Sequence, residues 1–364
     1  MTPTESSHQF SNQCSDQWQL FLKNVAVHYG KHIAVNNINL ALEKGDIGCL
    51  LGPSGCGKTS LQRAIAGFEP LINGHIELAG KLVSRPGFSL SPEKRRVGMV
   101  FQDFALFPHL SIAKNISFGL RHLTADERQQ RVMELLAMVE LVEVADRYPH
   151  ELSGGQQQRI ALARAIAPKP DILLLDEPFS SLDATLREII AKEVRKVLKA
   201  HKITAILVTH DQHEAFAIAD KIGVMNSGQL IQWDTPYQLY HQPQTPFVAN
   251  FIGEGKVIQV CANAKGQLEN SLGVIANNKQ WQAGKNYGVL VRPDDLVYDA
   301  KSDKAFVIVD KLFRGAEYMY LLSLPDKQQV LCVTPSHIDL AIGDYLPVTT
   351  DLQHLVVFDG GDTL

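Results

Sequence analysis

Cysteine is scarce in this sequence, and the cysteines that occur lie far apart. The 364 residues include only five, none in a C-x-x-C pair: Cys14, Cys49, Cys56, Cys261 and Cys332. Disulfide frameworks and structural zinc sites need grouped or regularly spaced cysteines. We therefore expect neither, and the pattern fits a reducing cytoplasm.

A surplus of positive charge and a long apolar run are also missing. Lys and Arg number 35 against 39 Asp and Glu, a formal net charge of −4. Because proteins that bind phosphate backbones non-specifically carry a basic surplus, we expect no nucleic-acid partner. No uncharged apolar run approaches the roughly 20 residues that cross a bilayer. Residues 1–19 are polar and lack the apolar core of a signal peptide. Any work at a membrane would need other chains.

Strand and helix patterns alternate through the larger part of the chain. Short apolar runs at 47–51, 172–175 and 204–208 are typical of buried parallel strands, and 125–142 and 183–201 have the spacing of amphipathic helices. After residue 253 the runs become short, β-type and separated by turn residues. We predict a polar extension at 1–19, an α/β domain at 20–253 and a small all-β domain at 254–364.

A glycine-rich loop follows the first buried run. Residues 52–59 read GPSGCGKT, which matches G-x-x-x-x-G-K-[ST] between a strand and a helix. Backbone N–H groups of such a loop bind phosphate oxygens, while Lys58 reaches the β- and γ-phosphates and the Thr59 hydroxyl binds Mg²⁺. The predicted phosphate-binding residues are Gly52, Pro53, Ser54, Gly55, Cys56, Gly57, Lys58, Thr59 and Ser60.

Two acids end the run at 172–175. We expect Asp176 to hold Mg²⁺ through water and Glu177 to act as general base toward a water molecule. The alternative is that the two acids merely end a strand before Pro178. Gln102 and His210 each follow another strand pattern, and we expect Gln102 to contact Mg²⁺ or water and His210 to bond both the γ-phosphate and Glu177.

The sequence Leu-Ser-Gly-Gly-Gln at 152–156 precedes a helical run. With the preceding motifs it resembles the ATP-binding-cassette (ABC) ATPase family across residues 21–251. The resemblance implies an α/β P-loop NTPase fold, ATP and Mg²⁺ as cofactors, Tyr29 stacked on adenine, and a D-loop that ends at Asp183. It also implies a homodimer, in which the signature residues of one copy close over ATP held by the other: Ser153, Gly154, Gly155 and Gln156.

The segments 291–296 and 313–315 resemble the regulatory domain of the OB/MOP (TOBE) type found on many importer ATPases. The whole chain resembles the ferric-ion importers most. That resemblance implies ATP hydrolysis coupled to import of ferric iron, at the cytoplasmic face of the cell membrane. The implied partners are permease subunits and, indirectly, an extracytoplasmic substrate-binding protein. Importers of molybdate, sulfate, polyamine, thiamine or sugar stay as alternatives, as does a soluble cassette ATPase of nucleic-acid repair or translation.

The loop Phe104–His109 is unusually aromatic. One interpretation is that it lines a groove for a cytoplasmic helix of the permease, because exposed apolar patches often mark interfaces. The alternative is internal packing.

Overall fold

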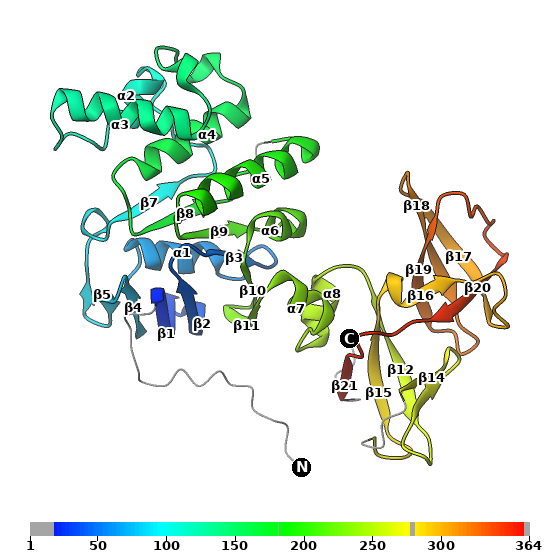
Figure 1. The fold of residues 1–364 in the computed structure, drawn as a ribbon. Coiled ribbons are helices and arrows are strands. Elements are labelled where there is room, and N and C mark those ends of the chain that lie inside the picture. The colour runs from blue at the N-terminus through cyan, green and yellow to red at the C-terminus, as the bar shows by residue number, and fades with distance from the viewer. Residues whose placement is uncertain (1–17, 181, 277–280, 360–364) are drawn as a thin grey trace. The chain divides into compact units, whose positions relative to one another are not determined.

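The computed structural model describes residues 18–180, 182–276 and 281–359. The chain forms two compact units, one up to Thr235 and one from Pro236, which Figure 1 shows in blue to green and in yellow-green to red. The α/β fold followed by a β fold is confirmed. The domain boundary expected between residues 253 and 254 stays a prediction, and all but the last two residues of the 1–19 extension lie outside the described part.

A six-stranded, mostly parallel sheet forms the centre of the first unit. Its strand order is β11-β10-β3-β9-β8-β7, and only the β10–β11 pair is antiparallel. The strands are β3 (Ile47–Leu51), β7 (Val97–Val100), β8 (Ile172–Asp176), β9 (Ala205–Thr209), β10 (Lys221–Asn226) and β11 (Gln229–Asp234). Every residue of β3 and β9 is buried, as expected for strands covered on both faces.

An antiparallel sheet of order β2-β1-β4-β5-β6 lies beside it. It contains β1 (Trp18–Tyr29), β2 (His32–Glu43), β4 (Asn73–Leu78), β5 (Lys81–Arg85) and β6 (Phe88–Ser89). Both sheets share one hydrophobic core with α1 (Lys58–Ala66), to which α1 contributes Leu61 and Ile65. This burial fixes α1 against the strands, and so fixes the loop that joins β3 to α1.

Arg95 is a buried cation of this unit that has neutral partners. Its guanidinium donates to the carbonyl oxygens of Ala64 and Ile65 at 2.9 Å and to Ser84 Oγ at 2.8 Å. Burial lowers the pKa of Arg95 to about 10, so the group stays charged at neutral pH. It thereby adds hydrogen bonds to carbonyl groups of the last turn of α1, where partners within the helix run out.

Helices make up the rest of the first unit. They are α2 (Ile112–Ser117), α3 (Ala125–Met138), α4 (Gly154–Ile166), α5 (Ala184–Ala200) and α6 (Gln212–Ile218). The helix expected at 125–142 ends early: Val139 is its C-cap and Glu140 takes a left-handed backbone with φ of 58°. The start of α3 is fixed by a capping box between Thr124 and Glu127.

The second unit begins with α7 (Pro236–His241) and α8 (Pro246–Phe251) and continues as antiparallel β-structure. One sheet has the order β14-β13-β12-β15-β21 and the other β16-β20-β17-β18-β19. Tyr320 is fully buried in their common core and its hydroxyl donates to the Ile338 carbonyl at 2.7 Å. The first sheet holds β12 (Lys256–Ala262), β13 (Leu268–Asn270), β14 (Gly273–Ala276), β15 (Asn286–Val291) and β21 (Val357–Asp359). The second holds β16 (Leu296–Tyr298), β17 (Ala305–Phe313), β18 (Glu317–Ser323), β19 (Gln329–Pro335) and β20 (Tyr345–Thr350).

Candidate functional site

The loop between β3 and α1 has a backbone that only glycine accommodates at its key positions. Gly55 and Gly57 have φ of 79° and 102°, in the left-handed region. A Cβ on Gly57 would lie 2.2 Å from the Ala34 carbonyl oxygen, and one on Gly52 would lie 2.3 Å from that of Met225. The loop is therefore held tightly against β2 and β10, with its backbone free to adopt the turn that ends at the N-terminus of α1.

Lys58 folds back into this loop. Its ammonium group donates to the carbonyl oxygens of Gly52 at 2.7 Å and Pro53 at 3.0 Å, and the residue is 6% exposed. The first turn of α1 contains no acidic residue, so its N–H groups and partial positive charge face the loop uncompensated. Thr59 and Ser60 lie in that first turn. The arrangement suits an anion of high charge.

The two acids lie at the carboxyl end of β8. Asp176 is the last residue of the strand, and the backbone N–H of Glu177 donates to the Val208 carbonyl of neighbouring β9 at 2.9 Å. Burial, followed by the charge of Glu177, raises the pKa of Asp176, whereas Arg63 and Lys58 oppose that shift. A bound cation would favour the charged form of Asp176 in the same way.

His210 directly follows β9 and contacts the second of these acids. Its Nδ1 lies 3.3 Å from Glu177 Oε1. Because β8 and β9 are parallel neighbours, their carboxyl ends meet at one edge of the sheet. Glu177 has φ of 43°, a conformation that is strained for a residue with a side chain. The Ser180 hydroxyl donates to the Glu177 carbonyl at 2.9 Å and helps to hold this turn.

The remaining predicted residues are spread over several elements. Gln102 is exposed just after β7, at the same edge as Asp176, because β7 pairs in parallel with β8. Tyr29 ends β1 and is 43% exposed. Asp183 caps α5, accepting from the Leu186 N–H at 2.9 Å, while the neighbouring D-loop residue Ser181 lies outside the described part.

The signature residues form the start of α4. Ser153 is the N-cap, and a capping box joins it to Gln156 through contacts of 3.0 and 3.4 Å. Gly154 and Gly155 occupy the first turn, which has no acidic residue. Within the described residues, no hydrogen bond connects this turn to the phosphate loop of the same chain. The structure thus brings together the phosphate loop, Asp176, Glu177 and His210. Among the described residues, no hydrogen bond joins the signature residues to this group.

Several supporting residues were absent from the sequence prediction. Buried Glu214 accepts a 2.5 Å hydrogen bond from Thr209, the residue before His210, and burial raises the pKa of Glu214. Arg164 on α4 donates to the carbonyl oxygens of Phe104 and Ala105 at 2.9 and 2.7 Å. No sequence pattern marks these contacts, because each joins different elements. Glu214 belongs to α6 and Thr209 ends β9, while Arg164 of α4 binds the loop that follows β7.

Buried Asn115 also holds the aromatic loop at 104–109. Its side chain bonds both the N–H and the carbonyl of Phe107, at 2.8 and 3.1 Å. Phe104 is 6% exposed, so this ring packs internally. The ring of Phe107 packs on the exposed ring of Phe118, with 4.6 Å between the ring centroids. The loop therefore combines internal packing with an aromatic surface, and its contact with a permease stays a prediction.

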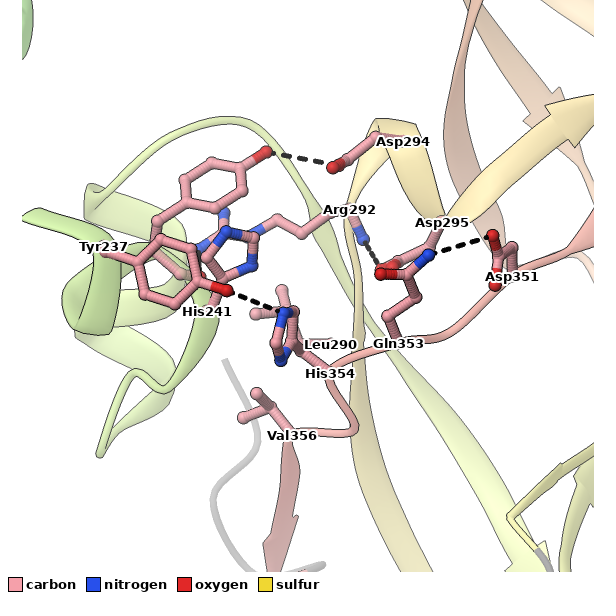
Figure 2. A pocket seen from close by; sticks show the side chains of 11 residues that line it. Tyr237, His241, Leu290, Arg292, Asp294, Asp295, Asp351, Gln353, His354 and Val356 are labelled. Carbon is pink, nitrogen blue, oxygen red and sulfur yellow. Dashed lines mark hydrogen bonds between the residues drawn. The ribbon is translucent and has the colours of Figure 1, made fainter.

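A separate pocket of about 250 Å³ lies within the second unit. Figure 2 shows Tyr237 and His241 from α7 facing His354, with the Tyr237 hydroxyl 3.0 Å from His354 Nε2. Arg292 fills one side: its guanidinium lies 4.2 Å from the Tyr240 ring and donates to the carbonyls of Tyr240, Ala249 and Glu254 at 2.9 to 3.0 Å. Arg292, which belongs to the 291–296 segment, thus joins α7 and α8 to the end of β15.

Comparisons with known proteins agree with this architecture. A family model described as ABC transporter matches residues 35–180, and one described as TOBE domain matches residues 289–358. The Fe(3+) ions import ATP-binding protein FbpC of Fusobacterium nucleatum is 38% identical over 354 residues, 93% of each chain. The spermidine/putrescine import ATP-binding protein PotA of Haemophilus ducreyi is 40% identical over 350 residues, 90% of this chain and 93% of that one.

Two solved structures resemble part of the chain. One is cbiO1 of Clostridium perfringens, part of the ABC transporter complex cbiONQ, with a TM-score of 0.57 and 28% identity over 62% of this chain and 92% of that one. The other is a dimeric, post-hydrolysis ATP-binding cassette, MJ0796, bound to ADP and Pi, with a TM-score of 0.51 and 31% identity over 59% of this chain and 98% of that one. The chain therefore belongs to the ABC transporter family, among its ATP-binding subunits that carry a TOBE domain.

Proposed function

We propose that this protein is the ATP-hydrolysing subunit of an ABC importer. The observation that carries the proposal is the 3.3 Å contact between His210 and Glu177 at the sheet edge that also bears the phosphate loop. Residues 52–60 would bind the triphosphate, with Lys58 turning its ammonium group from the Gly52 and Pro53 carbonyls to the phosphates. Tyr29 would stack on the adenine ring.

Magnesium fits the donor set at this edge. The half-buried Asp176 carboxylate has a raised pKa because of burial and the adjacent Glu177, and a divalent cation would relieve both effects. Thr59 and Gln102 supply the neutral oxygens that Mg²⁺ accepts beside a carboxylate. When bound, the ion would neutralise charge that develops on the phosphate oxygens.

The chain's own residues would direct the attacking water. Glu177 would accept the proton of that water. His210, within reach of the same carboxylate, would orient the carboxylate and bond the γ-phosphate. The bond from the Glu177 N–H to the Val208 carbonyl holds the backbone of Glu177 in its left-handed conformation. Only a turn that is over-determined by its surroundings keeps such a geometry.

A second copy of the chain would complete the site. The first turn of α4 offers Ser153 and the N–H groups of two glycines at an unneutralised helix N-terminus, which is a second anion-binding surface. The dimeric cassette with ADP and Pi, 31% identical over 59% of this chain, supports such a pairing. ATP would then join the two copies, and hydrolysis would separate them.

We further propose peripheral attachment to permease subunits at the cytoplasmic face of the cell membrane, with a substrate-binding protein as an indirect partner. Within residues 18–180, 182–276 and 281–359, no helix has the length and apolar character of a membrane span. For the cargo we propose ferric iron, supported by the FbpC relatives of Fusobacterium nucleatum and Photobacterium profundum. Polyamine is the second candidate, supported by the PotA relatives.

The cargo is tested by uptake in the native host. Cells with the wild-type chain and cells with Lys58→Ala are given radiolabelled ferric iron or radiolabelled putrescine. Iron uptake that falls at least tenfold in the variant, with unchanged putrescine uptake, supports the proposal. The reverse pattern assigns polyamine, and unchanged uptake of both overturns both candidates.

The catalytic proposal is tested with Glu177→Gln. The variant keeps size and hydrogen bonding but lacks the base, so we expect hydrolysis to fall by at least about 100-fold. Size-exclusion chromatography with magnesium and saturating ATP should show the variant as a dimer and the variant without nucleotide as a monomer. Unchanged turnover would remove Glu177 from this role, and a monomer under all conditions, alone or with permease, would refute the ATP-bridged dimer.

A further inference from the structure

The first unit contains a basic pocket at the amino ends of the central strands, whereas the phosphate loop lies at their carboxyl ends. A pocket of about 330 Å³ opens where strands β8 and β9 begin, next to the turn that leads into β3. Asp171 and Thr204, which line it, directly precede these two strands. A five-residue strand is about 16 Å long. The pocket and the nucleotide site lie at opposite ends of these strands and are therefore separated by about that length.

Positive charge dominates the lining. The lining includes the basic side chains of Lys44, Arg131, Lys169 and Lys202 and the imidazole of His201, and Asp171 is its single carboxylate. This concentration occurs in a chain whose formal net charge is −4. A concave surface lined by one sign of charge concentrates counter-ions of the opposite sign.

Three of the four cations lack internal partners among the described residues. In the part of the chain that the structure describes, the ammonium groups of Lys44, Lys169 and Lys202 make no hydrogen bond or ion pair. Asp171 pairs with Arg96, which does not line the pocket, at 3.4 Å. Arg131 contacts Glu134 at 3.3 Å, but its Nε is buried and has no hydrogen-bond partner. The pocket thus holds three cationic side chains that the described protein groups do not neutralise.

Helix ends explain only part of this pattern. Lys169 and Lys202 follow α4 and α5, where cations are favourable, yet both have left-handed φ values of 55° and 51° at which glycine is preferred. Lys44 follows a strand, and Arg131 lies in the middle of α3. Four elements therefore direct cations to one cavity, which helix capping does not require.

We propose that this pocket binds a phosphate-ester anion with two phosphate groups, as an anion site separate from the nucleotide site. Each phosphate monoester carries about −1.5 to −2 charges at neutral pH, so two groups match the unpaired cations. The volume is in the range of pockets that hold small organic ligands. A soluble bisphosphate and the headgroup of a diphosphate lipid share this chemistry.

The test is a calorimetric titration of the full chain with fructose 1,6-bisphosphate, after magnesium and a non-hydrolysable ATP analogue have filled the nucleotide site. We expect saturable binding that weakens at least tenfold in K169E/K202E and in the milder K169Q/K202Q. It should persist in the charge-preserving K169R/K202R and in the matched surface control Lys81→Glu. Binding should also weaken when salt is raised. Circular dichroism and ATP hydrolysis report whether each variant is folded.

A parallel arm uses vesicles of phosphatidylcholine with and without phosphatidylinositol 4,5-bisphosphate, whose headgroup carries two phosphate monoesters. Sedimentation with the bisphosphate-lipid vesicles that depends on Lys169 and Lys202, without binding of the sugar bisphosphate, assigns the anion to a lipid headgroup and supports the site. Binding in neither arm overturns the proposal. Binding that K169E/K202E retains, or that Lys81→Glu abolishes equally, overturns it too.

Discussion

Asp295 is a single carboxyl group whose surroundings change its proton affinity. It lies beside the pocket of the second unit, where burial raises its pKa from 3.8 to about 6 and Asp294 adds to the shift. The backbone N–H of Arg292 opposes the shift by donating to Asp295 at 2.6 Å. Because the folded state keeps the proton to a higher pH than the unfolded chain, this group's contribution to stability is lost as pH rises from about 4 to about 6.

Asp295→Asn should remove that pH dependence. We expect the second unit of the variant to be more stable than wild type at pH 7 by about 1 kcal/mol, after allowance for solvent screening of this partly exposed group. The two proteins should be nearly equal at pH 4. Hydrogen exchange of the β15 and β16 peptides, compared between variant and wild type at each pH, measures the difference. Equal protection at pH 7 would contradict the assigned shift.

One side chain supplies several of the contacts that attach helices α7 and α8 to the end of β15. Arg292 is 4% exposed, donates three hydrogen bonds to carbonyl groups and stacks on Tyr240. A lysine cannot present the planar fork that reaches all three carbonyls. We expect Arg292→Lys to lower the free energy of unfolding by about 2–4 kcal/mol.

Denaturant unfolding of the full chain, with hydrogen exchange of the α7 and α8 peptides, measures this effect. Arg314→Lys is the matched control, because Arg314 forms an ion pair with Glu254 at 2.5 Å in which both side chains are partly exposed. That variant should cost less than about 1 kcal/mol. Equal losses in both variants would show that Arg292 has no special role in the attachment.

Hydrophobic pattern predicts these elements better than polar contacts. Strand β3 matches its predicted range of 47–51, and α5 begins and ends within one residue of the expected 183–201. The end of α3 differs because nothing in the local pattern marks the left-handed turn at Glu140. The proximity of Glu177 and His210 follows from parallel strand order. By contrast, the α1 carbonyls that Arg95 binds and the three carbonyls that Arg292 binds lie about 30 to 50 residues away and have no periodic signal.

At the scale of the whole molecule, the loop 104–109 is the part whose proposed partner is another protein. Arg164 and Asn115 fix its backbone while Leu106 is only partly buried. If this surface receives a permease helix, Leu106→Glu should abolish ATP-driven transport by the assembled transporter. ATP hydrolysis by the isolated protein should stay within about twofold of wild type, because the loop's anchoring bonds are retained.

Transport in reconstituted vesicles, measured beside ATP hydrolysis of the free subunit, separates the two effects. Leu82→Glu introduces the same charge on the partly exposed strand β5 and serves as the control. Normal transport by Leu106→Glu would refute the docking role. Loss of nucleotide binding would show instead that the loop supports the ATPase fold.

The unusual backbone of Glu177 also bears on how this protein can evolve. A side chain held in that region costs about 1–2 kcal/mol, and asparagine tolerates it better than glutamate does. A screen that rewards heat resistance alone would therefore enrich replacements such as Glu177→Asn. If Glu177 is the general base proposed above, those molecules would be robust but inactive, and only selection for turnover would retain the glutamate. Adaptation to higher temperature would then find its gains elsewhere in the chain.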